Sequence, residues 1–137
     1  MLLSIRSILV LAIVACGFAA ADLATDQRKK CTFGCTRSNP LMREAGCARK
    51  AGYNSQTKQD SYLLKKANPT EGHPGYYNCL GTGMEQTVCC WNHKIIIPPN
   101  SILKAMVVDG TGEMTFNNLC HISPPMSSTW GDPTDCQ

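Results

Sequence analysis

Gln86-Thr87-Val88-Cys89-Cys90-Trp91 contains a pair of adjacent cysteines, and this stretch decides how the chain must be held together. Neighbouring residues of an extended segment point to opposite sides. A disulfide between two neighbours would also violate the usual Cα separation of about 4.4 to 6.8 Å. We therefore predict that Cys89 and Cys90 bond to different partners, so that one short segment is tied in two directions.

Six other cysteines after residue 21 are available to the doublet. They are Cys31, Cys35, Cys47, Cys79, Cys120 and Cys136. Eight cysteines in the 116 residues from 22 to 137 is a density typical of small secreted domains stapled by disulfides. We predict four bridges among these eight residues. The spacing leaves the connectivity open, because eight cysteines allow about 105 pairings.

The first 21 residues have the pattern of a secretory signal peptide. One charged residue, Arg6, precedes an apolar run over residues 8–15, and small residues follow up to Ala21. We predict cleavage between Ala21 and Asp22, which also removes Cys16. The alternative is a membrane anchor, but a spanning helix needs about 20 apolar residues and this run is shorter. The prediction is therefore a secreted, extracellular protein without a membrane segment.

The polar residues 22–30 come next and end in Arg28-Lys29-Lys30. We predict a flexible leader here, because polar segments next to a terminus are seldom ordered. The basic run also leaves open that a processing protease releases a chain that begins at Cys31. Residues 31–137 are predicted to form one disulfide-rich domain, since neither half is large enough to stand alone.

Charge is nearly balanced over the predicted mature chain, with 12 Lys and Arg against 10 Asp and Glu. This balance gives no reason to expect binding to nucleic acid or to a membrane surface. The distribution is uneven: residues 22–70 carry ten basic and four acidic groups, and residues 71–137 carry two basic and six acidic groups. Attraction between the two halves within one fold is the simplest interpretation.

The strongest helix signal covers Pro40–Lys50. Ser38 or Asn39 can cap the free backbone N–H groups, proline suits the first helical position, and Gly52 is a suitable stop. Residues 61–66 fit either a short helix or a strand, because so short an apolar run does not separate the two.

The later residues show the pattern of extended structure. We predict one β-hairpin from residues 76–80 and 85–90 around Gly81-Thr82-Gly83. A second hairpin is predicted from residues 102–108 and 114–119 around the Asp109-Gly110 turn. The similar turns fit a weak internal duplication or shared turn chemistry. Ile95-Ile96-Ile97 is predicted to be a buried strand that ends at Pro98.

Together these signals predict the α+β class. The expected architecture is a small disulfide-stapled domain with one N-terminal helix and a β-hairpin-rich antiparallel sheet.

Two catalytic or metal-binding arrangements are conceivable, and neither fits its pattern. Zinc could take Cys89, Cys90 and His93 with Cys120 and His121, but the spacing matches no paired-ligand motif and an oxidising route consumes thiols.

Paired-carboxylate hydrolysis would rely on Asp109 and Glu113, which flank a turn where solvated charges are ordinary. The sequence contains no G-x-S-x-G, H-E-x-x-H or phosphate-binding glycine motif. We therefore predict no enzyme activity, no cofactor and no metal.

Aromatic residues are the best candidates for a binding surface, because such rings dominate interface energetics. The candidate surface consists of Tyr76, Tyr77 and Trp130. Trp91 is adjacent to the doublet, and we expect it to pack against the disulfides in the core.

The chain resembles the small secreted cysteine-rich proteins of fungi, many of which are effector candidates of plant pathogens. The resemblance rests on the signal at residues 1–21, the eight cysteines and the Tyr77-Asn78-Cys79 to Cys89-Cys90 block. Hydrophobins also have eight cysteines but carry two doublets, whereas this chain has one.

The resemblance implies a non-enzymatic secreted effector that acts by binding a host protein or a cell-wall glycan and suppresses or triggers host defence. The expected form is a monomer. The alternatives are a toxin-like or antimicrobial secreted protein, or an inhibitor of a secreted hydrolase.

Overall fold

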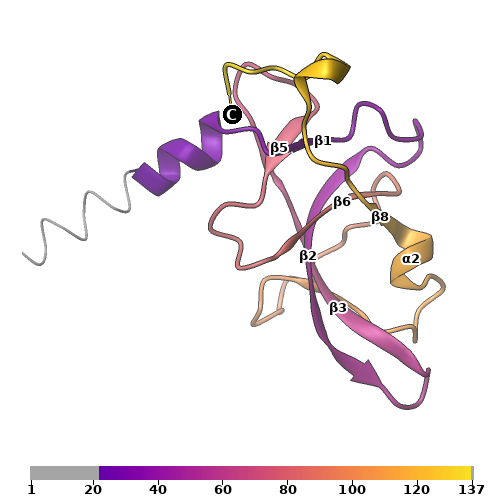
Figure 1. Ribbon diagram of the computed structural model, residues 1–137. Coiled ribbons are helices and arrows are strands. Elements are labelled where there is room, and N and C mark those ends of the chain that lie inside the picture. The colour runs from indigo at the N-terminus through magenta and orange to yellow at the C-terminus, as the bar shows by residue number, and fades with distance from the viewer. Residues whose placement is uncertain (1–21, 137) are drawn as a thin grey trace, which may run out of the picture.

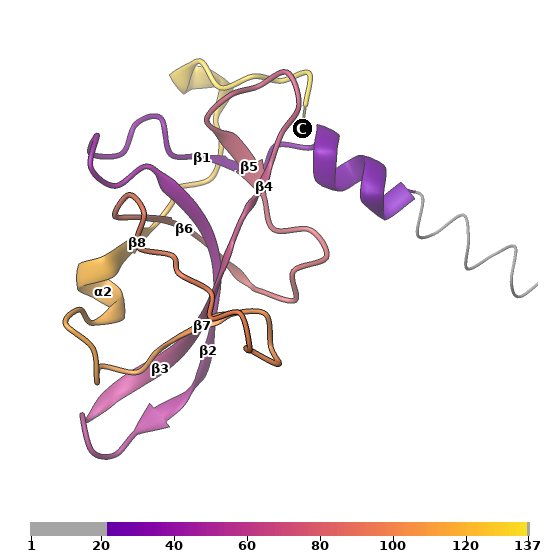
Figure 2. The same cartoon turned by 180° about the vertical axis from the view of Figure 1, so that it is seen from behind.

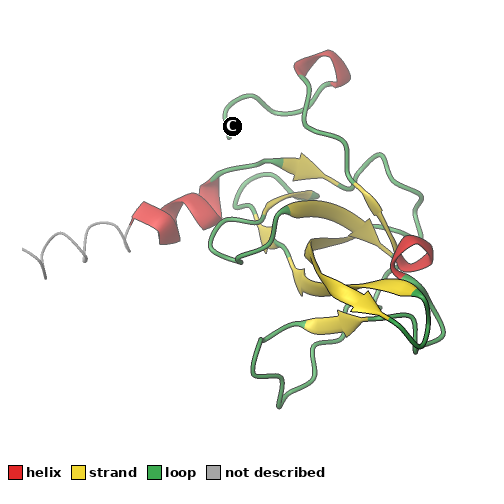
Figure 3. Ribbon diagram, turned by 60° about the horizontal axis from the view of Figure 1, so that its bottom comes forward, coloured by secondary structure: helices red, strands yellow, loops and turns green. Residues whose placement is uncertain are grey.

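The computed structural model describes residues 22–136. It contains two antiparallel sheets with short helices at their margins, as Figures 1 and 3 show. The predicted α+β class is confirmed. The predicted signal peptide, residues 1–21, lies outside the described residues and stays a prediction.

The larger sheet has five strands in the order β7-β3-β2-β6-β8. Its strands are β2 (Glu44–Asn54), β3 (Gln59–Lys66), β6 (Gln86–Cys90), β7 (Met106–Val108) and β8 (Cys120–Ile122). One face is covered by the short helix α2 (Phe116–Leu119), whose Phe116 ring stacks on Tyr62 of β3 at a centroid distance of 3.9 Å. The main apolar core lies here, around Leu64 and Val88, both fully buried.

The smaller sheet has three strands in the order β1-β5-β4. They are β1 (Phe33–Gly34), β4 (Asn68–Pro69) and β5 (Tyr76–Asn78). The fully buried Phe33 and its neighbour Cys35 form a second core with Ala45 and Cys89 of the larger sheet. The two sheets therefore share a packed boundary, and the doublet lies in it.

The structure joins all eight predicted cysteines in four disulfides. Cys89 bonds to Cys35, and Cys90 bonds to Cys120. Cys89 thus ties β6 to the smaller sheet, whereas Cys90 ties β6 to its neighbour β8 within the larger sheet. The prediction that the doublet reaches two different partners is confirmed.

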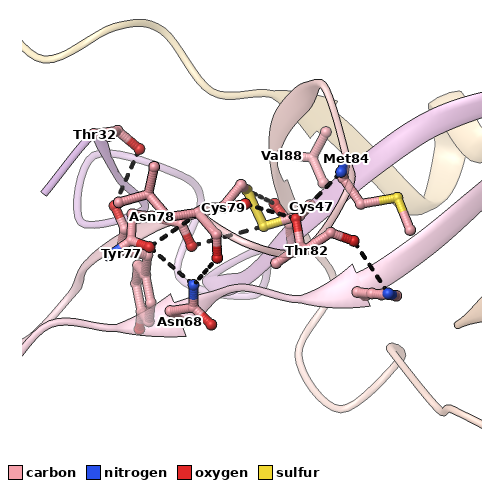
Figure 4. Close-up of a disulfide and its surroundings, with 12 residues drawn as sticks. Thr32, Cys47, Asn68, Tyr77, Asn78, Cys79, Thr82, Met84 and Val88 are labelled. Carbon is pink, nitrogen blue, oxygen red and sulfur yellow. Dashed lines mark hydrogen bonds between the residues drawn. A yellow bond between two sulfur atoms is a disulfide. The ribbon is translucent and has the colours of Figure 1, made fainter. Parts of the chain in front are cut away.

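The remaining disulfides join more distant parts of the chain. Cys47 on β2 bonds to Cys79, directly after β5, and makes a second link between the two sheets (Figure 4). Cys31 bonds to Cys136 and holds the C-terminal segment against the start of β1. The last helix, the 3-10 helix η1 (Ser128–Trp130), lies on this tethered segment.

The helix predicted at Pro40–Lys50 is wrong, because residues 44–54 form the long strand β2. β2 pairs with β3 on one side and with β6 on the other, and residues 45–48 are all buried. Strand pairing on both sides outweighs the intrinsic helix propensity of this segment. The polar residue predicted as a helix cap, Asn39, instead makes a turn in which its side-chain Oδ1 accepts the backbone N–H of Leu41 at 3.0 Å.

Neither predicted hairpin forms. β5 belongs to the smaller sheet and β6 to the larger one, although the predicted glycine turn between them exists with Gly81 at φ 71°. β7 pairs with β3, and residues 116–119 form α2 rather than a strand. Consecutive strands pair at two other places instead: β2 with β3, which assigns residues 61–66 to a strand, and β4 with β5.

The predicted strand at Ile95-Ile96-Ile97 is also absent from the structure. These residues form an irregular segment in which Ile95 is buried and Ile96 is 67% exposed. The backbone N–H of Ile95 donates to the Glu44 carboxylate at 3.0 Å instead of to a neighbouring strand. Pro98 and Pro99 follow, as expected for a segment that cannot extend a sheet.

Residues 22–29 are helical, whereas we predicted a flexible leader over residues 22–30. The C-terminal end of this helix contacts the body of the protein through its backbone carbonyls. The Asn78 side-chain amide donates to the carbonyls of Gln27 and Lys30, and the backbone N–H of Glu71 donates to the carbonyl of Arg28. The hydrogen bonds therefore hold the backbone around the basic run in place.

These bonds predict that folding protects Arg28-Lys29-Lys30 from proteases that cut after basic residues. A protease binds its substrate in an extended conformation. In the folded protein the carbonyl groups of Arg28 and Lys30 already accept hydrogen bonds from Glu71 and Asn78. We expect trypsin to cut at this run at least tenfold more slowly in the oxidised protein than in the reduced and alkylated chain, as followed by mass spectrometry. Equal rates would show that the segment is not held.

Candidate functional site

Two of the three predicted surface aromatics, Tyr76 and Trp130, lie around one buried carboxylate. We call this set the Asp132 cluster; it consists of Arg37, Tyr76, Ser127, Trp130 and Asp132. Its members come from β5, from the turn after β1 and from the C-terminal segment around η1. The Cys31–Cys136 disulfide holds that last segment against the body, which brings residues 95 positions apart into contact.

Asp132 has a fully buried side chain and accepts four hydrogen bonds. The Arg37 guanidinium donates to both carboxylate oxygens at 2.8 Å. The Tyr76 hydroxyl donates to Oδ1 at 3.0 Å, and the backbone N–H of Ser127 donates to Oδ2 at 2.8 Å. A forked Arg–carboxylate pair is among the strongest polar contacts in proteins, so this cluster fixes the C-terminal segment rigidly.

The contacts of Asp132 also set its titration. The Arg37 hydrogen bond, together with those of Ser127 and Tyr76, lowers the pKa of the Asp132 carboxyl from 3.8 to about 2. The carboxylate is better stabilised in the folded chain than in the unfolded chain. Its contribution to stability is therefore complete above about pH 4 and is lost as the pH falls towards 2.

We expect the stabilities of the wild type and of Asp132→Asn to converge in acid. The variant cannot lose a charge at this position, so the difference between their free energies of unfolding should be largest above pH 4 and should shrink towards pH 2. Urea denaturation at a series of pH values measures both curves. A difference that stays constant over this range would show that the ion pair does not stabilise the fold.

Trp130 is the exposed member of the cluster. Its residue surface is 57% exposed, and the Arg37 guanidinium lies 4.8 Å from the ring centroid. Arg37 therefore contacts the indole and the Asp132 carboxylate at the same time. An aromatic ring on a short helix, supported by a cation that is itself fixed, is presented to solvent with little freedom to reorient.

Tyr77 does not join this surface. Because successive residues of a strand point to opposite faces, Tyr77 turns away from Tyr76 and packs against Phe33 at a centroid distance of 5.9 Å. Trp91 is half-buried rather than fully in the core, and its indole N–H donates to the carbonyl of Asn118 at 2.9 Å. The predicted three-residue surface is thus reduced to Tyr76 and Trp130.

The cluster contains three residues that the sequence analysis did not single out, Arg37, Ser127 and Asp132. Arg37 and Asp132 are 95 positions apart, so no local sequence motif indicates that they form a pair. Their proximity depends on the Cys31–Cys136 bridge, whose pairing the spacing left open.

Two groups of residues could be considered as zinc sites. The cysteines of the hypothetical zinc site, Cys89, Cys90 and Cys120, are all disulfide-bonded, so they offer no thiolate. His73, Asp135 and Cys136 have ligand atoms within 4.8 Å of one another, but Cys136 is also in a disulfide. Neither group supplies the thiolate that it would need as a zinc site.

Asp109 and Glu113 flank a turn, as predicted. The Asp109 carboxylate accepts hydrogen bonds from the hydroxyl of Thr111 at 2.6 Å and from its backbone N–H at 3.0 Å. These bonds lower the pKa of the Asp109 carboxyl. The lowered pKa keeps the Asp109 carboxyl ionised at neutral pH.

Among residues 22–136, no helix combines the length and the apolar character needed to cross a membrane. Four disulfides in a domain of this size are typical of proteins that mature in an oxidising compartment. The chain matches no protein-family model, no curated protein and no solved structure.

Proposed function

We propose that this protein is a secreted, non-enzymatic effector-like protein that binds a host protein or a cell-wall glycan through Trp130. The observation that carries the proposal is the exposed indole on the disulfide-tethered C-terminal segment, backed by the Arg37–Asp132 pair. A rigid tryptophan loses little conformational freedom on binding, which is why such residues are frequent energetic centres of interfaces. The open part of the ring can stack on a sugar ring or enter a pocket of a partner.

The cluster supports a binding role because its polar groups are already satisfied. The oxygens of Asp132 accept four hydrogen bonds from the protein itself. The carboxylate therefore acts as a support for the ring, and the apolar ring surface is the part that is free to meet a ligand. Binding should for this reason depend on the indole more than on charge.

Trp130→Ala tests the proposal against Tyr53→Ala, a matched loss of an exposed aromatic ring on β2. Both variants and the wild type are applied as oxidised proteins to insoluble cell-wall polysaccharides and infiltrated into leaves. We expect Trp130→Ala to weaken polysaccharide binding or the defence response at least tenfold, as for a residue that contributes about 1.4 kcal/mol or more. Tyr53→Ala should behave as the wild type.

Other outcomes would decide against this function. If Trp130→Ala and the wild type act equally in both assays, the indole is not the binding centre. Growth inhibition of microbial cultures by the wild type, without any response in leaves, would favour the toxin-like alternative. Inhibition of a secreted hydrolase that survives Trp130→Ala would favour the inhibitor alternative.

A further inference from the structure

A second candidate site lies beside β7, away from the Asp132 cluster. In Figure 2, β7 lies in the lower half of the molecule, whereas the yellow segment that contains η1 lies at its top. An open cleft of about 300 Å³ runs between β7, the irregular segment at residues 94–96 and the turn at residues 109–114. Its volume is at the lower end of the range for ligand sites in proteins.

The lining of this cleft, which we call the β7 cleft, is mainly aliphatic and sulfur-containing. It is formed chiefly by Ile96, Met106, Val107, Met114 and Leu119. Two of these residues stay largely exposed, Ile96 at 67% and Val107 at 56%. Methionine side chains are flexible and polarisable, so Met106 and Met114 can adapt to apolar groups of different shape.

The position of β7 in its sheet indicates the kind of ligand. β7 is an edge strand, and in the part of the chain that the structure describes only β3 pairs with it. An extended polypeptide can lie along such an edge while one of its side chains enters the adjoining cleft. A small apolar molecule would use the cleft but gain nothing from the strand edge.

The charges around the cleft select the chemistry of the segment. Two carboxylates, Asp109 and Glu113, line it together with one ammonium group, Lys94. No ion pair of Asp109 or Glu113 occurs among the described residues. The hydrogen bonds from Thr111 keep the Asp109 carboxylate in its charged form. Two negative charges against one positive charge favour a basic partner.

We propose that the β7 cleft binds an extended polypeptide segment that presents one large apolar side chain beside lysine or arginine. The apolar side chain fills the space between Met106 and Met114, and the basic groups of the segment face Asp109 and Glu113. This site is separate from Trp130, so it stands or falls independently of the function proposed above.

Selection from a phage-displayed library of random heptapeptides on the oxidised full chain tests the proposal. Enriched peptides should combine two or more lysine or arginine residues with one Leu, Met, Phe or Trp. Their affinity should fall at least tenfold for Val107→Lys. Ile102→Lys is the matched control, because Ile102 is 96% exposed and does not line the cleft; it should leave the affinity unchanged.

Removal of the acidic groups gives a second readout on the same peptides. Asp109→Asn with Glu113→Gln keeps the shape of the turn, because the amide oxygen can still accept from Thr111. We expect a loss of roughly three- to tenfold, the size of two exposed charge contacts, and the loss should vanish in high salt.

Several results would overturn the proposal. These are the absence of an enriched pattern, enrichment of peptides without basic residues, and equal binding by Val107→Lys. Binding that is lost in Trp130→Ala and kept in Val107→Lys would assign the peptides to the Asp132 cluster. Self-association of the wild type that Val107→Lys abolishes would show that a second copy of the chain occupies the cleft.

Discussion

Asn78→Ala should lower the free energy of unfolding by about 3 kcal/mol, because it removes a fully buried amide that holds the end of the N-terminal helix to the smaller sheet. The Nδ2 group of Asn78 donates to the carbonyls of Gln27 at 2.9 Å and Lys30 at 2.7 Å. Its Oδ1 accepts from the Asn68 side chain at 2.9 Å and from the backbone N–H of Leu80 at 3.2 Å. Figure 4 shows the bond to Asn68 next to the Cys47–Cys79 bridge.

Alanine leaves all four partners of the Asn78 side chain without this contact, and each buried polar group left unpaired costs about 1 to 3 kcal/mol. Urea denaturation with the disulfides intact measures the loss. Asn117→Ala is the matched control, since Asn117 is exposed on α2, and it should change the stability by less than about 0.5 kcal/mol. A loss from Asn78→Ala as small as that of the control would contradict the assigned contacts.

Asn78→Asp separates the hydrogen bonds that the Asn78 side chain donates from those that it accepts. The carboxylate keeps the volume and the acceptor oxygens but cannot donate to Gln27 and Lys30. We expect trypsin to cut faster at Arg28-Lys29-Lys30 in this variant than in the wild type, with cleavage sites elsewhere less affected.

Removal of the Cys31–Cys136 bridge should lower the free energy of unfolding by roughly 3 kcal/mol, less than its sequence separation suggests. These cysteines are 105 residues apart, and a loop of that length corresponds to roughly 4.7 kcal/mol of unfolded-state entropy. The two bridges of the doublet shorten the covalent path between Cys31 and Cys136. The chain runs four residues from Cys31 to Cys35, crosses to Cys89, and steps to Cys90.

The second half of this route crosses from Cys90 to Cys120 and runs sixteen residues to Cys136. The other bridges therefore already restrict the unfolded chain to a path of about 21 residues, and the last bridge closes only that loop. Thermal and urea unfolding of the Cys31→Ala, Cys136→Ala double variant give the loss. A value near 4.7 kcal/mol would contradict the short route and with it the pairing of the doublet.

Turn chemistry and disulfide number were the features that the sequence predicted well. The turns at Gly81 and Gly110 exist, with φ of 71° and 81°, because such turns depend on residues only a few positions apart. The strands on each side of them pair elsewhere. Strand pairing depends on contacts between distant residues, and the local sequence around a turn does not specify its partners.

The strand β2 shows why the predicted helix failed. Its residues 45–48 are small, and both neighbouring strands and the core approach closely. A Cβ atom on Gly46 would lie 2.9 Å from Cδ1 of Ile95 and 3.1 Å from Cγ2 of Val88. Small residues allow this close packing in a strand, but a segment of similar composition can also form a helix. Only the contacts with the neighbouring strands and the core decide between helix and strand.

The candidate site was predictable only in part. Tyr76 and Trp130 were singled out because aromatic residues are common in binding surfaces. Arg37 and Asp132, which fix the position of Trp130, have no signal in the sequence. The β7 cleft was not predicted either, because its lining comes from residues 94–96, residues 106–114 and Leu119, which no local pattern brings together.

Cys89 and Cys90 tie one strand in two directions, and mapping of the disulfides can show this pairing without reference to any activity. A digest of the non-reduced protein, fragmented by electron transfer so that the two adjacent cysteines separate, identifies the partner of each. The structure predicts Cys35 with Cys89 and Cys90 with Cys120, and no thiol that can be alkylated before reduction among the eight cysteines of residues 22–136. The exchanged pairing, Cys35 with Cys90 and Cys89 with Cys120, or free thiols at these positions, would show that the doublet is not arranged in this way.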